Sequence, residues 1–397
     1  EENCLKAEVM SVQSRACIVG IGESRYAKWG AIKDQSELSL ACDAILAAAS
    51  DSGISPQKID GFASFSNDRS EPALLMNALG IEQLRFTGMV WGGGGGGSCG
   101  AVALAQAAVE SGQANYVIVF RALCQGQAFR FGQFHPWTDH TCFAAPFGML
   151  APPQMFAPLV RRHMHLYGTQ PEHLGEVALS CRAYANRNPR AVMHDRRLTM
   201  DDYLSSRMIA DPLTLYDCCL ESDGAAALLI TTYERARDHK PQPIEILAAQ
   251  QSSGHLWGTG ILGGHNMPSD TYASANAADL AHDLYKRAGV RPQDIDVVQF
   301  YDAFTGMVLF ALEDFGFCGV GESGDYVSEG NLRLGGASPC NTSGGILSEA
   351  YIHGLNLVVE GVRQMRGEST AQVSGANLVL VSGGESVTPT SGLILGV

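Results

Sequence analysis

The feature that most constrains the fold of this chain is an internal repeat. Residues 53–60 read GISPQKID and residues 289–296 read GVRPQDID, so five positions match at an offset of 236 residues. Each copy follows an alanine-rich segment of helical character, at residues 38–49 and 277–288, and precedes an apolar run typical of a strand. Because the matched positions are not low-complexity sequence, the repeat predicts two related α/β halves.

A second pair of segments supports the duplication. The glycine run at residues 92–97 leads through a helical segment to the strand YVIVF at 116–120. The Gly344-Gly345 pair leads in the same way to the strand LVLVS at 378–382. Continuous apolar strands of this kind are typical of sheets covered by helices on both faces. The expected fold is therefore a duplicated α/β domain with five layers, α/β/α/β/α.

The repeat also suggests how the chain is divided. We expect residues 1–14 to form a polar tail, residues 15–265 the first half and residues 266–397 the second half. Within the first half, residues 121–208 lack a comparable strand run, so we expect an insertion that caps one end of the sheet. The insertion carries eight arginines between positions 161 and 207. Alone they indicate a solvated helix face, and they favour phosphate recognition only if the ligand is anionic.

Charge and cysteine usage exclude several classes of function. Lys plus Arg number 27 against 41 Asp plus Glu, a net charge of −14 without a basic run, so neither nucleic acid nor an anionic membrane is an expected partner. No segment reaches the roughly 18 apolar residues of a membrane span, and residues 1–14 do not resemble a secretory signal. The eleven scattered cysteines predict reduced thiols in the cytoplasm and assemble no metal site.

The glycine run itself is a candidate binding element. It lies in MVWGGGGGGSCG, residues 89–100, where a match to the dinucleotide fingerprint is trivial and no phosphate-loop lysine follows. Consecutive glycines predict a backbone that approaches a bulky group closely, and a helix N-terminus directs N–H groups at it. We therefore expect Gly94, Gly95 and Gly96 to contact the substrate.

Two further segments bring polar side chains to the same region. In residues 297–318 an apolar strand breaks at Tyr301 before a helix begins, which places this tyrosine where α/β proteins usually bind ligands. In residues 340–356 a glycine-containing loop carries Tyr351 and His353 towards the second glycine-led helix. A lone tyrosine or histidine is more often a core residue, but both loops together with the glycine run predict a site.

On these motifs the sequence resembles the thiolase superfamily, in particular its lipid-transfer-protein-like and sterol-carrier-like branch. The resemblance covers nearly the whole chain from about residue 15 and implies the thiolase fold, with a loop domain that helps to hold coenzyme A. It rests on VGIGESRYAKWG (19–30), AQAAVESGQANYVIVF (105–120), ESDGAAALLIT (221–231), YDAFTG (301–306), NTSGGILSEAYIHG (341–354) and VSGGES (381–386).

The departures from the thiolase pattern bear directly on function. The position of the family's nucleophilic cysteine falls on Gly95, and the positions of two further catalytic side chains fall on Tyr301 and Tyr351. The family's final cysteine is missing, because LVSGG stands there. Cys99, about one helical turn further on, is expected to be a packing thiol. Acyl transfer through an activated thiolate is therefore not expected.

Within this branch the two tyrosines resemble the steroid side-chain-cleaving aldolases. The resemblance implies retro-aldol cleavage of a steroid β-hydroxyacyl-CoA, of the 17-hydroxy-3-oxo-pregnene-20-carboxyl-CoA type, to a 17-ketosteroid and propionyl-CoA. We expect Tyr301 and Tyr351 to share the acid/base work, and which is the base stays open. The expected supporting groups are the side chains of Asp302, Asn341 and His353 and the amides of Gly344 and Gly345, which would hold the thioester oxygen.

The resemblance also implies partners. It implies a homodimer and a small acyl-CoA-binding partner with a zinc ribbon and an OB-fold, together a heterotetramer. We expect no cofactor in this chain, since coenzyme A belongs to the substrate and any zinc to the partner. Two alternatives remain open: a non-catalytic lipid or acyl-CoA carrier, and a thiolase-like acyltransferase that works without a cysteine.

Overall fold

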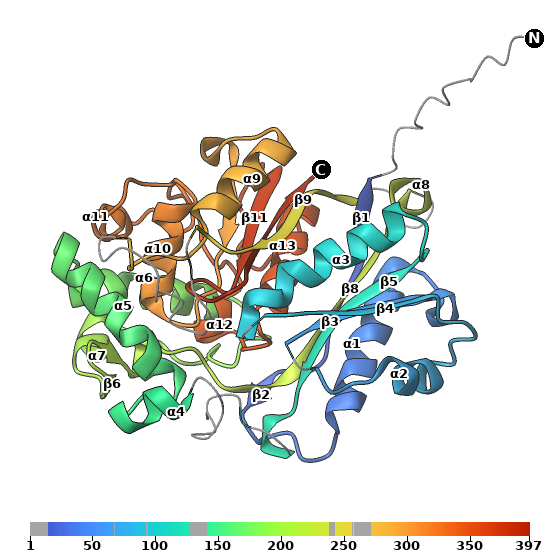
Figure 1. Cartoon of the computed structure of the whole chain (residues 1–397), viewed down its shortest axis with the longest axis horizontal. Coiled ribbons are helices and arrows are strands. Elements are labelled where there is room, and N and C mark those ends of the chain that lie inside the picture. The colour runs from blue at the N-terminus through green and yellow to red at the C-terminus, as the bar shows by residue number, and fades with distance from the viewer. Residues whose placement is uncertain are drawn as a thin grey trace, which may run out of the picture.

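The computed structural model describes residues 15–66, 68–92, 94–127, 130, 141–237, 243–255, 257 and 271–397 (Figure 1). Residues 1–14, expected to form a tail, lie outside the described residues. No helix in the described ranges is both long and apolar enough to cross a membrane.

The first half contains a mixed sheet flanked by helices. Its elements are β1 (Ala16–Glu23), β2 (Ala27–Lys28), α1 (Glu37–Ser52), β3 (Gly61–Phe65), α2 (Pro72–Leu79), β4 (Phe86–Val90), α3 (Ser98–Glu110), β5 (Val117–Leu123), β8 (Ser222–Thr232) and α8 (Tyr233–Ala236). Strands β3, β4 and β5 run parallel, and β8 pairs antiparallel with both β5 and β1.

The second half repeats this arrangement. Its elements are β9 (Ile244–Ser252), α9 (Ala278–Ala288), β10 (Val297–Gln299), α10 (Thr305–Asp314), α11 (Ser323–Ser328), α12 (Gly345–Ser348), α13 (Leu355–Arg366), β11 (Leu378–Gly383) and β12 (Thr390–Gly396). The order β10-β11-β12-β9 mirrors β3-β5-β8-β1, and the two half-sheets meet where β1 pairs with β9. The duplication and the α/β fold class predicted from the repeat are confirmed.

Strand pairing also shows to which half of the sheet β9 belongs. Seven residue pairs join β9 to β12, whereas two pairs join it to β1. The sequence-based division after residue 265 assigns β9 to the first half, but this strand is hydrogen-bonded chiefly to the second half.

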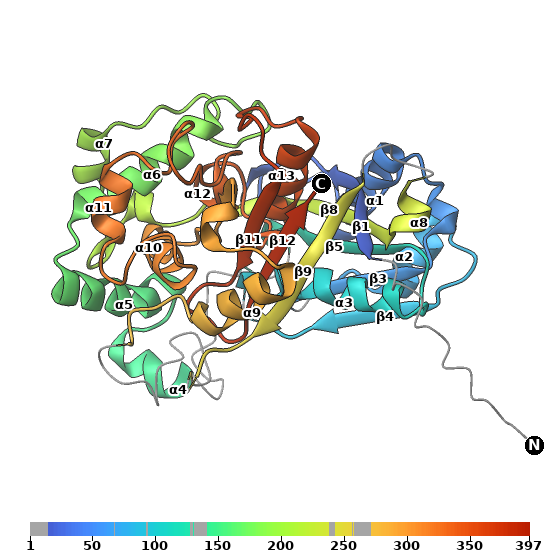
Figure 2. The same ribbon diagram turned by 90° about the horizontal axis from the view of Figure 1, so that it is seen from above.

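The layers follow from which helix packs on which strand. Helix α1 covers β1, β5 and β8 on the outside of the first half, and α9 covers β9 and β12 on the outside of the second (Figure 2). Helix α3 packs on β3, β5 and β8 of the first half and on β9 and β12 of the second, while α13 packs on β10, β11, β1 and β8. These two helices therefore form the layer between the half-sheets.

Local sequence explains the close packing of α1. The helix begins after Ser36, whose side chain caps it, and ends at Gly53 in the left-handed conformation. Under it, β1 carries Gly20 and Gly22, where a Cβ atom would overlap the helix backbone. The glycines thus let strand and helix approach each other more closely than any side chain would allow.

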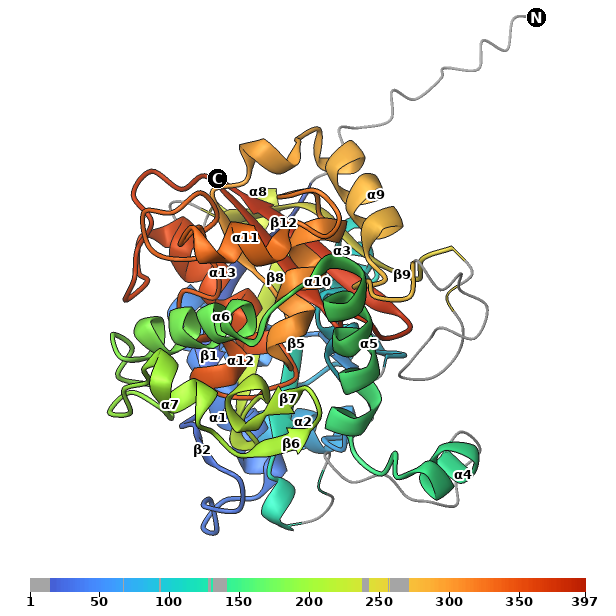
Figure 3. The ribbon, with the colours of Figure 1, turned by 90° about the vertical axis from the view of Figure 1, so that its left-hand side faces the viewer.

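The insertion lies beside the second half (Figure 3). Its elements are α4 (Thr141–Ala144), α5 (Pro152–Tyr167), α6 (Pro171–Ala185), α7 (Met200–Leu204), β6 (Met208–Ala210) and β7 (Leu213–Thr214). Helix α6 packs against α10, α11 and α12, so the insertion adjoins the segments that carry the expected catalytic residues.

Candidate active site

The structure brings the two expected catalytic tyrosines together. Tyr301 follows β10, and Tyr351 lies in the loop between α12 and α13. Their hydroxyl oxygens are 3.0 Å apart, at hydrogen-bond distance. Tyr301 is 3% exposed, whereas Tyr351 is half-buried. The pair therefore has an inner phenol, Tyr301, and an outer phenol, Tyr351.

The glycine run lies directly beside the inner phenol. The N–H of Gly95 donates a hydrogen bond of 3.0 Å to the hydroxyl oxygen of Tyr301. A Cβ atom at Gly95 would overlap the ring of Tyr301. The bulky group that residue 95 must accommodate is thus the chain's own tyrosine.

The neighbouring glycines have different surroundings. A Cβ atom at Gly94, where φ is +54°, would lie 3.3 Å from the Tyr301 hydroxyl and 3.7 Å from the Tyr351 hydroxyl. A Cβ atom at Gly96 would overlap the carbonyl of Pro389. Of the three glycines expected to contact the substrate, Gly94 adjoins both hydroxyls, and Gly95 and Gly96 are packed against protein atoms.

Asp302 anchors the loop that carries Tyr351. Its buried carboxylate accepts hydrogen bonds from the N–H groups of Ile346 at 2.9 Å and Leu347 at 3.1 Å, in the first turn of α12. Burial raises the pKa of Asp302 to about 6. Residue 345 must be glycine, because its φ is +61° and a Cβ atom there would overlap this carboxylate. Asp302 therefore holds α12 against the end of β10.

Asn341 anchors the same loop from its other end. Its side-chain amide donates to the carbonyl of Phe300 at 2.9 Å, immediately before Tyr301. The N–H of Gly344, expected to hold the thioester oxygen, donates to the backbone carbonyl of Asn341 at 2.8 Å. Asn341, Gly344 and Gly345 thus shape the loop, and the structure gives the Gly344 N–H a backbone partner.

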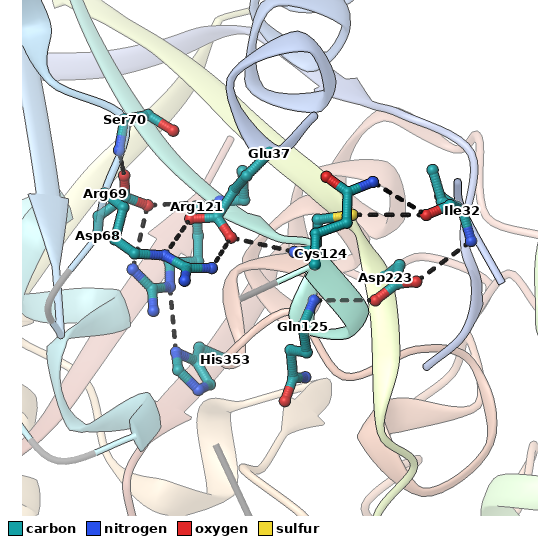
Figure 4. Close-up of polar contacts among 12 residues, drawn as sticks. Ile32, Glu37, Asp68, Arg69, Ser70, Arg121, Cys124, Gln125, Asp223 and His353 are labelled. Carbon is teal, nitrogen blue, oxygen red and sulfur yellow. Dashed lines mark hydrogen bonds and ion pairs between the residues drawn. The ribbon is translucent and has the colours of Figure 1, made fainter. Parts of the chain in front are cut away.

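His353 lies beside the outer phenol and is part of a buried cluster (Figure 4). Its ring is perpendicular to that of Tyr351, with centroids 5.0 Å apart. Its Nδ1 atom accepts a hydrogen bond of 3.1 Å from Nε of Arg121, which forms an ion pair with Asp68 at 3.1 Å. Sequence analysis missed Arg121 and Asp68. The signal that was available is an arginine inside the otherwise apolar strand β5.

A cavity of about 250 Å³ opens between the insertion and α12. It is lined by Ala178, Arg182, Met193, Leu198, Leu215, Tyr216, Cys218, Cys219, Leu220, Glu221, Leu347 and Ser348. Two hydrogen bonds connect the segment 218–222 of this wall to the segments of the tyrosines: the N–H of Cys219 donates to the carbonyl of Ala303 at 2.9 Å, and the N–H of Tyr351 donates to the hydroxyl of Ser222 at 3.0 Å. The cavity is mostly apolar, and neither tyrosine is among its lining residues.

Cys99 is a packing thiol. It is fully buried in α3, and burial raises its pKa to about 12, so it is protonated at neutral pH. No group of three or more His, Cys, Asp or Glu side chains positioned for a metal ion occurs in the described part of the chain.

Comparisons with known proteins show which family this chain belongs to. A family model described as "Thiolase C-terminal domain-like" matches residues 264–396. The chain is 41% identical to the "Steroid side-chain-cleaving aldolase" of Thermomonospora curvata, over 96% of this chain and 97% of that protein. It is 38% identical to the "17-hydroxy-3-oxo-4-pregnene-20-carboxyl-CoA lyase" of Mycobacterium tuberculosis, over 97% of this chain and 100% of that protein.

A solved structure leads to the same assignment. The "Ltp2-ChsH2(DUF35) aldolase" superposes with a TM-score of 0.89 at 40% identity, covering 96% of this chain and 98% of that chain. The resemblance predicted from the sequence motifs is therefore confirmed. This chain belongs to the thiolase superfamily, in the branch of the steroid side-chain-cleaving aldolases.

Proposed function

We propose that this protein is a carbon–carbon lyase that cleaves a steroid β-hydroxyacyl-CoA by a retro-aldol reaction. The substrate is of the 17-hydroxy-3-oxo-pregnene-20-carboxyl-CoA type, and the products are a 17-ketosteroid and propionyl-CoA. The reaction belongs to the bacterial breakdown of sterol or bile-acid side chains. The named relatives support the substrate class, and one observation supports the chemistry: the hydroxyls of Tyr301 and Tyr351 are in hydrogen-bond contact beside Gly95, the position that the resemblance matches to the thiolase nucleophile.

The bond changes require a proton acceptor and a proton donor. The β-hydroxyl loses its proton and becomes a carbonyl, the Cα–Cβ bond breaks, and its electron pair forms the enolate of the thioester. A proton then returns to Cα, which gives propionyl-CoA. The net change moves one proton from oxygen to carbon, without oxidation and without a covalent intermediate.

The tyrosine pair fits these demands. The half-buried Tyr351 can meet the β-hydroxyl, and Tyr301 behind it hydrogen-bonds to Tyr351 and to the Gly95 N–H. Two hydroxyls in contact can pass a proton between them. The pair can thus remove the proton from oxygen and return one to carbon.

The cavity beside the pair suits the acyl-CoA. Its mostly apolar wall fits an apolar portion of the substrate, and Arg182 and Glu221 supply charged groups at its lining. Because four of the lining residues, Ala178, Arg182, Met193 and Leu198, belong to the insertion, we assign to it the role of covering the substrate.

Two kinds of partner complete the proposal. The resemblance to the Ltp2-ChsH2(DUF35) aldolase supports a DUF35 partner, which we expect to bind acyl-CoA through a zinc ribbon and an OB-fold in a heterotetramer. Strand β4 supports a homodimer, because it is an edge strand and is followed by Trp91, which is 89% exposed.

The free cysteines among the described residues support a reducing compartment, the cytoplasm.

Product analysis tests this function. The purified protein, with and without a DUF35 partner, is incubated with the 17-hydroxy acyl-CoA and with an analogue that lacks this hydroxyl. The proposal predicts equimolar 17-ketosteroid and propionyl-CoA from the first compound and none from the second. Tight binding without cleavage, with the partner present, would establish a carrier instead. An acyl adduct on Cys99 would overturn the non-covalent mechanism.

A further inference from the structure

We propose that Arg121, held by Asp68 and acting through His353, is a positioning residue that makes Tyr351, rather than Tyr301, the proton acceptor of the pair. This inference rests on the proposed retro-aldol function and deepens it. The Arg121–His353 contact would then determine which of two otherwise similar phenols accepts the proton.

The first observation is that the guanidinium of Arg121 is buried and fixed. The residue is 1% exposed. Its Nη1 donates to the carbonyl of Phe65 at 3.0 Å and to Asp68 at 3.1 Å, and its Nη2 donates to the carbonyl of Ser66 at 3.0 Å. A buried cation with so many defined acceptors is costly to desolvate, so its position close to the tyrosines demands an explanation.

The second observation concerns the protonation of His353. Arginine remains protonated, so its Nε–H must donate and Nδ1 of His353 must accept at 3.1 Å. The proton of the neutral imidazole is therefore on Nε2. Burial, and then the charge of Arg121, hold the pKa of His353 well below its usual value. His353 thus stays neutral. It fixes the position of Arg121 relative to Tyr351 without adding a charge of its own.

The third observation is that the two phenols are electrostatically unequal. Burial raises the pKa of both tyrosines. For Tyr351, Cys219 and Glu221 raise the pKa further, whereas the hydrogen bond with Tyr301 and the charge of Arg121 lower it. For Tyr301, Tyr351 and Cys219 raise the pKa further, and the hydrogen bond from the Gly95 N–H lowers it. Negative charge is therefore less costly on Tyr351.

The hydrogen-bond directions agree with this inequality. The Gly95 N–H can only donate, so it occupies one acceptor site on the Tyr301 oxygen. The hydroxyl proton of Tyr301 can then point at the oxygen of Tyr351, 3.0 Å away. A phenolate on Tyr351 would be stabilised by Tyr301 as donor on one side and by the perpendicular His353 ring and Arg121 on the other.

The test measures ionisation at position 351 directly. Difluorotyrosine is incorporated there, because its phenol ionises at a lower pH than tyrosine, and fluorine NMR follows its titration in the whole protein. Arg121→Met combined with Asp68→Asn removes the cation and its counter-charge together. The proposal predicts that the midpoint rises by about one pH unit, equivalent to an about tenfold weaker tendency to ionise.

A second variant should shift the titration midpoint in the opposite direction. Asp68→Asn alone keeps the cation and its hydrogen-bonding oxygen but removes the counter-charge, so the midpoint at position 351 should fall. With wild-type Tyr351, the rise of kcat/KM with pH should shift in the same two directions. Opposite shifts from neighbouring substitutions are not expected of a residue that only stabilises the fold.

The matched control is the ion pair of Arg291 and Asp294, 3.1 Å apart in the turn before β10 and no part of this cluster. Arg291→Met combined with Asp294→Asn should leave the midpoint unchanged. Equal midpoints in wild type, the double variant and Asp68→Asn would overturn the proposal. Because the titration needs no substrate, it decides the role of Arg121 even if the protein cleaves no steroid, in which case the proposed function alone fails.

Discussion

The N–H of Gly95 donates a 3.0 Å hydrogen bond to the hydroxyl of Tyr301, and the ring of Tyr301 fills the space that a side chain at residue 95 would need. The two positions are therefore alternatives. A side chain at residue 95, which the resemblance matches to the thiolase nucleophile, and the ring of Tyr301 in its present position exclude each other.

The first prediction concerns this exclusion. In Gly95→Ala the added methyl group must displace the ring of Tyr301, at a cost of about 1–3 kcal/mol in the free energy of unfolding. A displaced hydroxyl should lower kcat by about a hundredfold. Denaturant titration and product analysis measure the two effects.

Gly112→Ala is the control for that variant. Gly112, unlike Gly95, has a positive φ of +73°, and a Cβ atom there meets no other atom within 4 Å. It should cost about 1–2 kcal/mol through backbone strain while leaving kcat unchanged. Full activity in Gly95→Ala would show that the contact with Tyr301 is dispensable.

The second prediction concerns Asp302. Alanine at this position orphans two buried N–H groups of α12, so the free energy of unfolding should fall by about 2–4 kcal/mol. Because α12 precedes the loop of Tyr351, kcat should also fall by about a hundredfold in the folded protein.

Asp296 provides the matched control for Asp302. Its carboxylate also accepts two backbone N–H groups, from Asn377 at 2.7 Å and Leu378 at 3.0 Å, but it precedes β10, away from the tyrosines. Asp296→Ala should lower stability and leave kcat intact. Equal kcat values in folded Asp302→Ala and Asp296→Ala would show that Asp302 does not anchor the loop of Tyr351.

The third prediction is a pH dependence of stability. Burial raises the pKa of Glu385 to about 8, and its carboxylate lies against the N–H of Tyr301 at 3.3 Å. The unfolded chain releases this proton near pH 4 and the folded chain only near pH 8, so this group makes the folded state progressively less stable across that interval.

Glu385→Gln should remove this contribution. The free energy of unfolding of the variant relative to wild type should increase from pH 5 to pH 9, as measured by urea denaturation. The same substitution at the exposed Glu82 should give no such trend. A constant difference between Glu385→Gln and wild type would contradict a raised pKa.

The fourth prediction concerns the edge of the sheet. If β4 pairs with a second copy, Trp91→Glu should convert a dimer into a monomer, because a charge would replace the exposed indole at that edge. Sedimentation measures the change. Phe147→Glu, at an equally exposed position (85%) far from β4 in the sequence, should leave the dimer intact. A Trp91→Glu dimer would place the interface elsewhere.

The fold could be predicted from the sequence because each copy of the repeat carries its own local pattern of helix, turn and apolar strand. The segments 116–120 and 378–382 are rich in apolar residues, and their structural counterparts β5 and β11 occupy equivalent places in the two half-sheets. The predicted helix at residues 277–288 corresponds to α9, and the strand predicted to break at Tyr301 corresponds to β10, which ends at Gln299.

Part of the site could not be predicted, because it depends on contacts between distant segments. Nothing in the sequence around Gly95 says that the group beside it is Tyr301, 206 residues away. For the same reason Arg121 stood out only as a charge within an apolar strand, since its partner His353 lies 232 residues further on. The two tyrosines could therefore be predicted from sequence motifs. The contacts that hold them and the charges that act on them could be identified only in the folded structure.

The central claim is that the hydroxyls of Tyr301 and Tyr351 carry out the cleavage. The most direct measurement is the rate of 17-ketosteroid and propionyl-CoA formation by Tyr301→Phe and Tyr351→Phe, with Tyr184→Phe as control. Tyr184 is a buried phenol with one hydrogen bond, to the carbonyl of Leu332 at 3.0 Å, so its loss tests stability alone. Each site variant should bind the acyl-CoA but lose about 10²–10⁴-fold in kcat, while Tyr184→Phe should keep its activity. Wild-type rates in both site variants would contradict this claim.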